Sequence, residues 1–382
     1  MACLLLRSSR DIFRQALTMV EPRKPVSTVG FVDQYCQIYR NLFSDVRNFE
    51  AFKFLQLGMI SETKRKSLPA IARDVGFKDG QSLHNFLRDS LWDVNAVREM
   101  RLWLAKIAIG DCPITLCIDE TGDEKKGSAT NYVAKQYISN LGKTAKGIVS
   151  VNAYAFIDGI TYPLIFKVFK PHSRLKKGDV YKTKSQLGIE ILRELKGWGF
   201  KIKLILADSM YGDEDVIGAL NQLKLDFIVA IRSNHPVWLL PEQRVQYSRW
   251  FVYEQTLPYR QSDLRFIREI IFSQRCPLRY YQISKNIDPD PKSENMWLIT
   301  TNLPGNIKLK VAQLYSLRIL LDYGFKQIKN ELGWADFRLT DYQSIERWWE
   351  IIFSAYLLVS LQSNQFKLTL IGAKERFRTA LV

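Results

Sequence analysis

The periodicity of apolar and polar residues divides the chain into regions of different predicted structure. In the middle of the chain, short β-branched runs bounded by polar turns predict strands, and apolar residues repeating every three to four positions predict helices. Asp158-Gly159 lies between two strand-like runs and predicts a tight hairpin turn. The predicted strands are 114–119, 148–157, 161–169, 202–207 and 226–231, and the predicted helices are 184–197 and 213–223. This alternation predicts an α/β core.

The segments on either side of this core have other patterns. Residues 1 to about 110 are mostly helical in pattern, most clearly from Arg47 to Met59 and from Asp93 to Ile109. Short strand-like runs separated by polar turns predict a β-rich insertion after the core strands. The predicted division is a helical N-terminal region at 1–110, a first core part at 111–235, the insertion at 236–301, the C-terminal helices of the core at 302–365 and a basic tail at 366–382.

Residues 67–88 have the plan of a helix-turn-helix within the N-terminal region. A short helix is followed by a turn bounded by Gly76 and Gly80 and then by a second short helix. An ordinary helical hairpin packed on a core has the same pattern, so both interpretations stay open. If the segment binds DNA, Gln81, Ser82, Asn85 and Arg88 are the side chains expected to face a groove, with Lys64, Arg65 and Lys66 on phosphates.

Four polar residues near the C-terminal end of the chain share one face of a predicted helix. Tyr315, Arg318, Asp322 and Lys329 lie at offsets 0, 3, 7 and 14. At 3.6 residues per turn they project from a stripe roughly 60° wide. A phenol, a guanidinium, a carboxylate and an ammonium on one stripe could bind phosphates while holding a metal ion. The alternative is a solvated helix face with an ordinary i,i+4 ion pair.

Two further acids follow predicted strands. Asp119 ends the apolar run that begins at Cys112, and Asp208 ends the run that begins at Lys201, each with a turn expected after it. The carboxyl ends of strands in α/β sheets are where such folds place their sites. Because Mg²⁺ prefers oxygen ligands, Asp119, Asp208 and Asp322 are candidate ligands for divalent cations.

With these three segments in this order, the chain resembles the bacterial insertion-sequence transposases of the DDE superfamily, in the group marked by a Tyr-x2-Arg-x3-Glu-x6-Lys signature. The matching segments are "IDETGDEKKG", "ADSMYGD" and "YSLRILLDYGFKQIKNELGWADF", and the likeness runs from about Phe54 to about Leu361. The resemblance implies an RNase H-like fold: a mixed sheet with helices on its faces, and a β-rich insertion before the last catalytic helix.

The chain departs from this pattern at the third acid. The family has glutamate where this chain has Asp322, whose side chain is one methylene shorter. Glu331 is the other candidate, but it lies about 160° round the helix from Tyr315. It also comes just before Gly333, which predicts a helix stop. Asp322 is therefore predicted as the third acid, and its short reach leaves open whether the protein is active.

The resemblance also implies a reaction. DDE transposases hydrolyse a phosphodiester at the element end and join the freed 3′ hydroxyl to target DNA, using two divalent cations, Mg²⁺ or Mn²⁺ as its substitute. Asp119, Asp208 and Asp322 would hold the cations, and Tyr315, Arg318 and Lys329 would bind phosphates beside the cut. Two alternatives stay open: a DNA-binding relic that no longer cleaves, and a structure-selective nuclease of the same fold.

The charge of the chain agrees with a nucleic-acid partner. Lys and Arg number 55 against 39 acids, a formal net charge of +16, which suits a polyanion. Basic residues gather after the first catalytic strand and between Lys167 and Lys184, where a solvated loop is the alternative. The DNA-binding candidates here are Lys125, Lys126, Arg174, Lys176 and Lys177. The resemblance adds Trp297 for base stacking, with a strand tryptophan in the core as the alternative.

The remaining sequence features concern location and partners. The five cysteines and three histidines show no zinc-binding spacing, so free thiols in a reducing cytoplasm are expected. The chain has no run of about 18 apolar residues, so no membrane contact is expected. The resemblance implies a bacterial cytoplasmic protein at the nucleoid that binds double-stranded DNA, both element ends and target, and that forms a homodimer on those ends.

Overall fold

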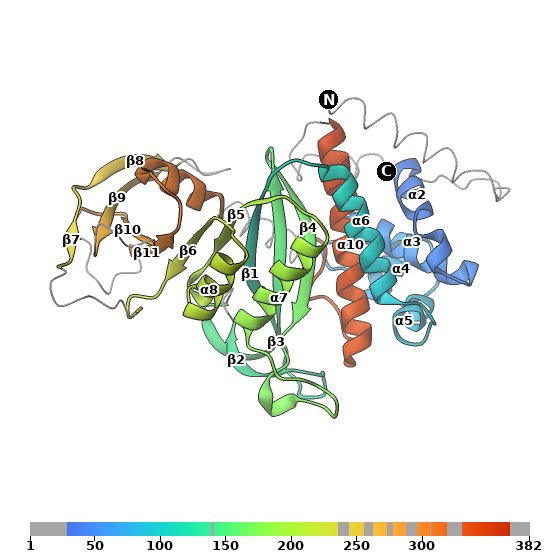
Figure 1. Ribbon diagram of the computed structural model, residues 1–382. Helices are drawn as coiled ribbons and strands as arrows, with labels where there is room; N and C mark the ends of the chain where they lie inside the picture. The colour runs from blue at the N-terminus through green and yellow to red at the C-terminus, as the bar shows by residue number, and fades with distance from the viewer. Residues whose placement is uncertain are drawn as a thin grey trace. The chain divides into compact units, whose positions relative to one another are not determined.

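The computed structural model forms two compact units, one helical and one built on a sheet (Figure 1). It describes residues 29–138, 141–235, 244–255, 263–272, 278–287, 296–305, 307–318 and 331–366. The helical unit falls within Met1–Ala108 and Gln327–Val382, and the sheet unit within Ile109–Lys326. None of the described helices is long and apolar enough to cross a membrane.

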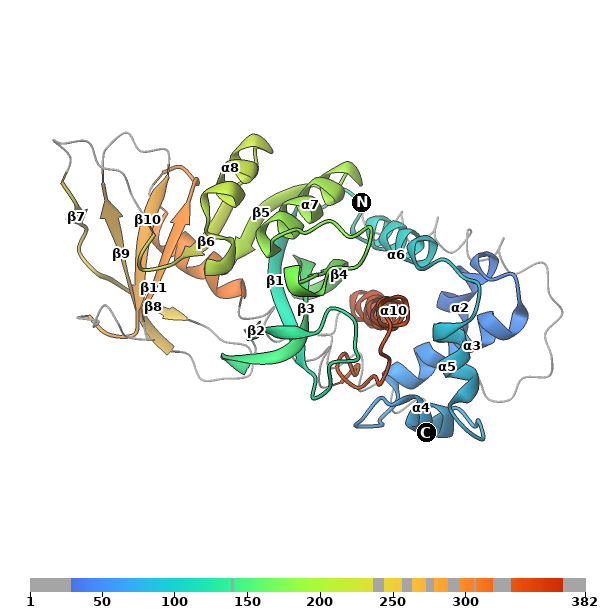
Figure 2. The same ribbon diagram turned by 90° about the horizontal axis from the view of Figure 1, so that it is seen from below.

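The helical unit brings the two ends of the described chain together. Its long C-terminal helix α10 packs against α3 and α5 (Figure 2). The core is rich in aromatic residues: the Trp334 and Trp349 rings stack with centroids 4.4 Å apart, and the buried Tyr35 hydroxyl donates to the Ser354 carbonyl at 2.9 Å. The helices are α2 (Gly30–Gln37), η1 (Arg40–Leu42), α3 (Val46–Ile60), α4 (Leu68–Asp74), α5 (Gln81–Arg88), α6 (Val94–Ile109) and α10 (Tyr342–Phe366).

The two short helices predicted between 67 and 88 are confirmed as α4 and α5. Ser67 and Gly80 precede them as N-caps, and proline stands in the first turn of α4, where a missing N–H costs no hydrogen bond. Leu83, Phe86 and Leu87 of α5 are buried, and both helices pack with α3. The opposite face of α5 is exposed, and its contact with DNA stays a prediction.

One mixed sheet runs through the described part of the sheet unit. Its order is β2-β3-β1-β5-β6-β11-β10-β9-β7, with β4 on β3 and β8 on β9. β1 is antiparallel to β3 and parallel to β5, and β6 is parallel to β5. The strands are β1 (Ile114–Glu124), β2 (Ala134–Ile138), β3 (Lys143–Ile157), β4 (Ile160–Val168), β5 (Ile202–Ala207), β6 (Phe227–Ile231), β7 (Gln246–Tyr247), β8 (Phe251–Gln255), β9 (Asp263–Ile271), β10 (Arg279–Ser284) and β11 (Met296–Thr301). The neighbouring order β4-β3-β1-β5-β6 is that of the predicted RNase H-like core.

Helices α7 (Lys184–Gly197) and α8 (Glu214–Gln222) lie side by side on the sheet (Figures 1 and 2). α7 begins with a capping box, in which Thr183 accepts from the Gln186 N–H and the Gln186 side chain accepts from the Thr183 N–H. The Asp213 carboxylate caps α8 by accepting from the Val216 N–H at 2.9 Å. These local signals explain why the two helices follow the sequence prediction closely.

The structure corrects one expectation about the strands and adds a detail to another. The predicted turn after Asp119 is wrong: β1 continues to Glu124, because Glu120 to Glu124 keep pairing with Val151 to Gly147 of β3. Strands are present in the predicted β-rich insertion, and one of them pairs with a core strand. Leu298 of β11 pairs with Ile231 of β6, so the insertion extends the core sheet.

Candidate active site

Two of the three predicted acids lie at adjacent strand ends. Ile118 of β1 is opposite Ala207 of β5, the last pair of that parallel ladder, so Asp119 and Asp208 are the next residues on strands about 4.8 Å apart. Asp119 is 8% exposed, and its carboxylate accepts from the Glu120 N–H at 2.8 Å. The Asp208 carboxylate accepts from the Met210 N–H at 2.9 Å and thereby caps η4 (Ser209–Tyr211).

A buried tyrosine lies in the field of these acids. Tyr211 is 1% exposed, and burial, followed by the negative charges of Asp119, Asp208 and Glu120, raises its pKa well above the usual value. Glu120 is itself buried and pairs with the Lys184 ammonium at 2.5 Å. The carboxylates of Asp119, Asp208 and Glu120 therefore all act on Tyr211, and the Glu120 carboxylate has a cation as its partner.

The remaining signature residues are only partly described. Tyr315 and Arg318 lie in the helical run 308–318 and are partly buried. Asp322 and Lys329 lie outside the described residues. Glu331 is in a turn before Gly333, whose φ is +70° and where a Cβ would meet the Lys66 Cβ at 2.4 Å. This left-handed glycine fits the predicted helix stop.

The described donors suit a hard divalent cation. Within the described ranges no three His, Cys, Asp or Glu side chains cluster as a metal site. Asp119 and Asp208 contribute only oxygens, and the Tyr211 hydroxyl is buried with no hydrogen-bond partner among the described residues. Oxygen ligands, with water filling the remaining positions, are what Mg²⁺ accepts. The residues present therefore fit Mg²⁺ or Mn²⁺.

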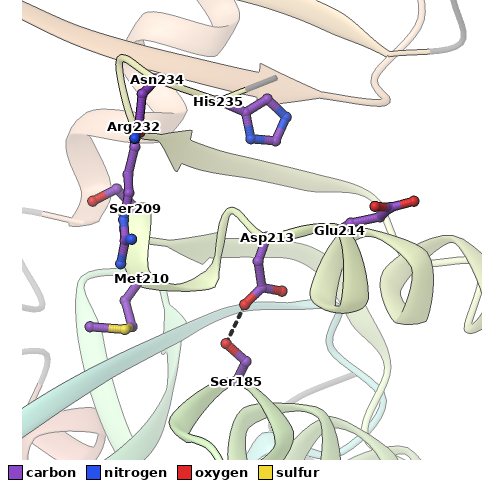
Figure 3. A pocket seen from close by; sticks show the side chains of 8 residues that line it. All are labelled: Ser185, Ser209, Met210, Asp213, Glu214, Arg232, Asn234 and His235. Carbon is purple, nitrogen blue, oxygen red and sulfur yellow. Dashed lines mark hydrogen bonds between the residues drawn. The ribbon is translucent and has the colours of Figure 1, made fainter. Parts of the chain in front are cut away.

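An open pocket of about 360 Å³ is lined in part by Ser209 and Met210, the two residues that follow Asp208 in the chain (Figure 3). Arg232 directly follows β6 and extends beside Ser209 toward Met210 (Figure 3). The Asp213 carboxylate accepts a hydrogen bond from the Ser185 hydroxyl. The lining residues are Ser185, Ser209, Met210, Asp213, Glu214, Arg232, Asn234 and His235. Sequence reasoning missed Arg232, although a cation directly after a predicted strand could have drawn attention to it.

Several predicted DNA-binding cations have partners within the protein. The Lys125 ammonium lies 2.6 Å from the Asp123 carboxylate. Arg174 donates to the Ser128 carbonyl at 2.7 Å, and Lys176 donates to the Asn131 side chain. Lys126 and Lys177 are exposed. The contacts of Arg174 and Lys176 link the loop after β4 to the loop after β1. The role of these cations in DNA binding stays a prediction.

The predicted cations before α4 differ in exposure. Lys64 and Arg65 are exposed, whereas Lys66 is fully buried. The Lys66 ammonium donates to the Ser61 carbonyl at 2.6 Å. The backbone N–H of Lys66 donates to the Asp336 carboxylate at 2.7 Å. Burial thus withdraws Lys66 from the surface as a phosphate contact, because its ammonium is held by Ser61 inside the helical unit.

The remaining candidates lie on α5 and β11. The Gln81 side chain donates to Asn85 at 2.7 Å, and Arg88 pairs with Asp89 at 2.9 Å; all are exposed. Trp297 is partly buried in β11. The Arg265 guanidinium lies 5.0 Å from the centroid of the Trp297 ring, so one face of the indole is already in contact with a cation.

Alanine at Asn85 or Arg88 is expected to weaken specific DNA binding about tenfold or more if each side chain contacts a base edge. The measurement is an electrophoretic titration with element-end DNA and with random DNA. Arg193→Ala is the control, because it removes the same charge from an exposed position on α7. An equal loss on both DNAs would assign α5 to phosphate contact or to structure alone.

Comparison with known proteins shows which family and which fold this chain is similar to. A family model described as DDE superfamily endonuclease matches residues 41–251. The probable transposase for insertion sequence element IS701 from Microchaete diplosiphon is 47% identical over 357 residues, which are 92% of this chain and 93% of that protein. A solved piggyBac transposase synaptic complex with hairpin DNA covers 88% of this chain and 70% of that chain, at 12% identity and a TM-score of 0.52. The last match shows the fold, a mixed α/β architecture of RNase H-like type.

Proposed function

Since this chain belongs to the DDE superfamily endonuclease family, together with the IS701 transposase that it matches, we propose that it cuts the ends of an IS701-type insertion sequence and joins the 3′ hydroxyl ends to target DNA. The observation that carries the proposal is the pair of carboxylates, Asp119 and Asp208, at the ends of adjacent parallel strands. Such a pair is the start of a two-metal phosphodiester site.

The metal ligands proposed are Asp119, Asp208 and Asp322. Asp119 would contact both cations, Asp208 would hold one of them, and Asp322 would hold the other. When bound, the two Mg²⁺ or Mn²⁺ ions activate the attacking oxygen and stabilise the leaving oxygen. Water is the first nucleophile and the DNA 3′ hydroxyl the second, so that one set of carboxylates serves both steps.

The residues proposed to bind DNA phosphates are Arg318, Lys329, Tyr315 and Arg232. Arg318 suits a bidentate grip on a phosphate and Lys329 a point contact, while the Tyr315 hydroxyl would donate to a phosphate oxygen. Arg232 is added from the structure, because it lines the same pocket as Ser209, the residue after Asp208 (Figure 3). The partners proposed are element ends and target DNA, bound by a homodimer in the bacterial cytoplasm at the nucleoid.

A second function is favoured by one residue. Asp322 is shorter than the family's glutamate, and a carboxylate that cannot reach its cation would leave a protein that binds element ends without cutting them. A structure-selective nuclease that never joins strands would use the same acids. The experiment that separates the three is incubation of the protein with its own flanking DNA and Mg²⁺ or Mn²⁺. Joined products indicate a transposase, cut products alone indicate a nuclease, and binding alone indicates the relic.

Asp322→Glu is expected to raise the cleavage rate, because the longer side chain brings the carboxylate nearer to the cation, and Asp322→Ala to remove the remaining activity. The rate of cleavage of labelled end DNA in Mn²⁺ is the measurement, with Glu331→Ala as the matched control. Normal cleavage by Asp322→Ala with none by Glu331→Ala would move the third ligand to Glu331. No cleavage by the parent or by Asp322→Glu would favour the relic.

A further inference from the structure

The Tyr211 hydroxyl is the feature of the site that neither the fold nor the proposed reaction explains. Tyr211 is 1% exposed, and within the described residues its hydroxyl oxygen has no hydrogen-bond partner. A buried hydroxyl left unpaired is costly, and buried tyrosines usually find an acceptor or donor. The position of this hydroxyl beside the catalytic strands therefore calls for a partner.

The Tyr211 ring is held in place from several sides. The backbone N–H of Tyr211 donates to the Asp208 carbonyl at 3.1 Å. Across the ring, α7 has Gly188, where a Cβ would lie 3.0 Å from the Tyr211 Cε1 and 3.8 Å from the Ile118 Cγ2 of β1. A Cβ at Gly212 would lie 2.3 Å from the Ala230 carbonyl oxygen. The ring thus packs against α7, and the turn η4 that carries it packs against α7 and β6.

The surroundings of the hydroxyl are acidic. The carboxylates that act on it are those of Asp119, Asp208 and Glu120. Glu120 has the Lys184 ammonium as an ion-pair partner, whereas Asp119 and Asp208 are the acids proposed to hold the cations. The phenol O–H of Tyr211 can act as a hydrogen-bond donor.

We propose, resting on the function proposed above, that Tyr211 is a positioning residue of the metal site, whose hydroxyl donates through one bridging water to the Asp119–Asp208 carboxylate pair. Groups that hydrogen-bond to metal ligands fix the orientation of those ligands, and their loss weakens metal binding by about 10–100-fold. Asp208 caps η4, the turn that contains Tyr211. The packing of the Tyr211 ring against α7 is therefore coupled to the orientation of the Asp208 carboxylate.

Mn²⁺ binding to the full chain without DNA tests this role. Tyr211→Phe keeps the ring and removes only the hydroxyl, and electron paramagnetic resonance titration measures the free Mn²⁺. The expected result is a fall in Mn²⁺ affinity of about 10–100-fold, with the metal-free melting temperature unchanged or raised. Tyr281→Phe is the matched control: Tyr281 is also fully buried with no hydroxyl partner among the described residues, but it lies on β10.

Three outcomes would overturn the inference, and the last of them would also overturn the proposed metal site. Unchanged Mn²⁺ affinity in Tyr211→Phe, while Asp208→Ala loses it, leaves the proposed function standing and removes Tyr211 from the site. A Tyr211→Phe variant that fails to fold without metal assigns the hydroxyl to the fold alone. Equal Mn²⁺ affinity in the parent and in Asp208→Ala removes the proposed metal site itself.

Discussion

Alanine at Asp119 or at Asp208 is expected to abolish strand cleavage and to leave DNA binding largely intact. The two carboxylates lie at adjacent strand ends, and each would hold a cation that stabilises the transition state by several kcal/mol. Because each 1.36 kcal/mol corresponds to a factor of ten, the cleavage rate should fall on the order of 10³-fold or more. Single-turnover cleavage of labelled end DNA, with a gel-shift titration in parallel, measures both quantities.

Asp215→Ala is the matched control for this pair. Asp215 is an exposed acid on α8, a few residues after Asp208, and its loss should leave the cleavage rate unchanged. Cleavage by Asp119→Ala at the parent rate would show that β1 does not deliver a metal ligand. Loss of DNA binding together with cleavage would instead point to a damaged fold.

Alanine at Glu350 is expected to lower the free energy of unfolding of the helical unit by about 3–5 kcal/mol. Glu350 of α10 and Arg101 of α6 are both fully buried, and an Arg101 Nη2 donates to a Glu350 oxygen at 3.3 Å. Arg98 adds a second donor at 3.2 Å. Burial alone would lower the pKa of Arg98, but the charges of Glu350 and Glu346 raise it. Removing Glu350 leaves buried positive charge without its main partner.

Urea unfolding followed by tryptophan fluorescence measures this loss, because Trp334 and Trp349 lie in the same core. Asp89→Ala is the control, since Asp89 pairs with Arg88 on the exposed surface of the same unit, where ion pairs contribute little. A loss at Glu350→Ala no larger than that of the control would mean that the buried arginines find other acceptors.

Elements with strong local signals were predicted closely from the sequence. β5 at 202–207 and α7 at 184–197 have the predicted bounds, because a β-branched run and a capping box specify each one locally. The hairpin at Asp158-Gly159 is also present, with φ of 48° and 84° at the two residues. Such positive values suit the turn that this dipeptide predicts.

Features that depend on distant partners were not predicted. β1 continues beyond Asp119 because β3 pairs with it, and the sequence from Glu120 onward has no apolar run that would show this. The pairing of β11 with β6 joins segments far apart in the chain, which periodicity cannot register. The burial of Lys66 likewise depends on Asp336, a partner from the other end of the helical unit.

Some residues of the candidate site were likewise predicted from the sequence, and others were not. Asp119 and Asp208 were predicted from strand ends and from the family resemblance, and membership of the DDE superfamily endonuclease family confirms the coarser part of that resemblance. The roles of these acids stay predictions, as does that of Asp322, which lies outside the described residues. Tyr211 and Arg232 were missed, because their relevance comes from the packing around η4 and from the end of β6 rather than from a motif.

The packing of α10 against α3 has a consequence for how the protein is made. The helical unit comes first in the sequence, yet its core is completed by a helix from the last part of the described chain. Domains usually fold in the order of their synthesis on the ribosome. Here the sheet unit is fully translated before α10 emerges, so the unit translated first must close last. A nascent chain that stalls before Tyr342 would leave the α3 surface uncovered and open to chaperones and proteases.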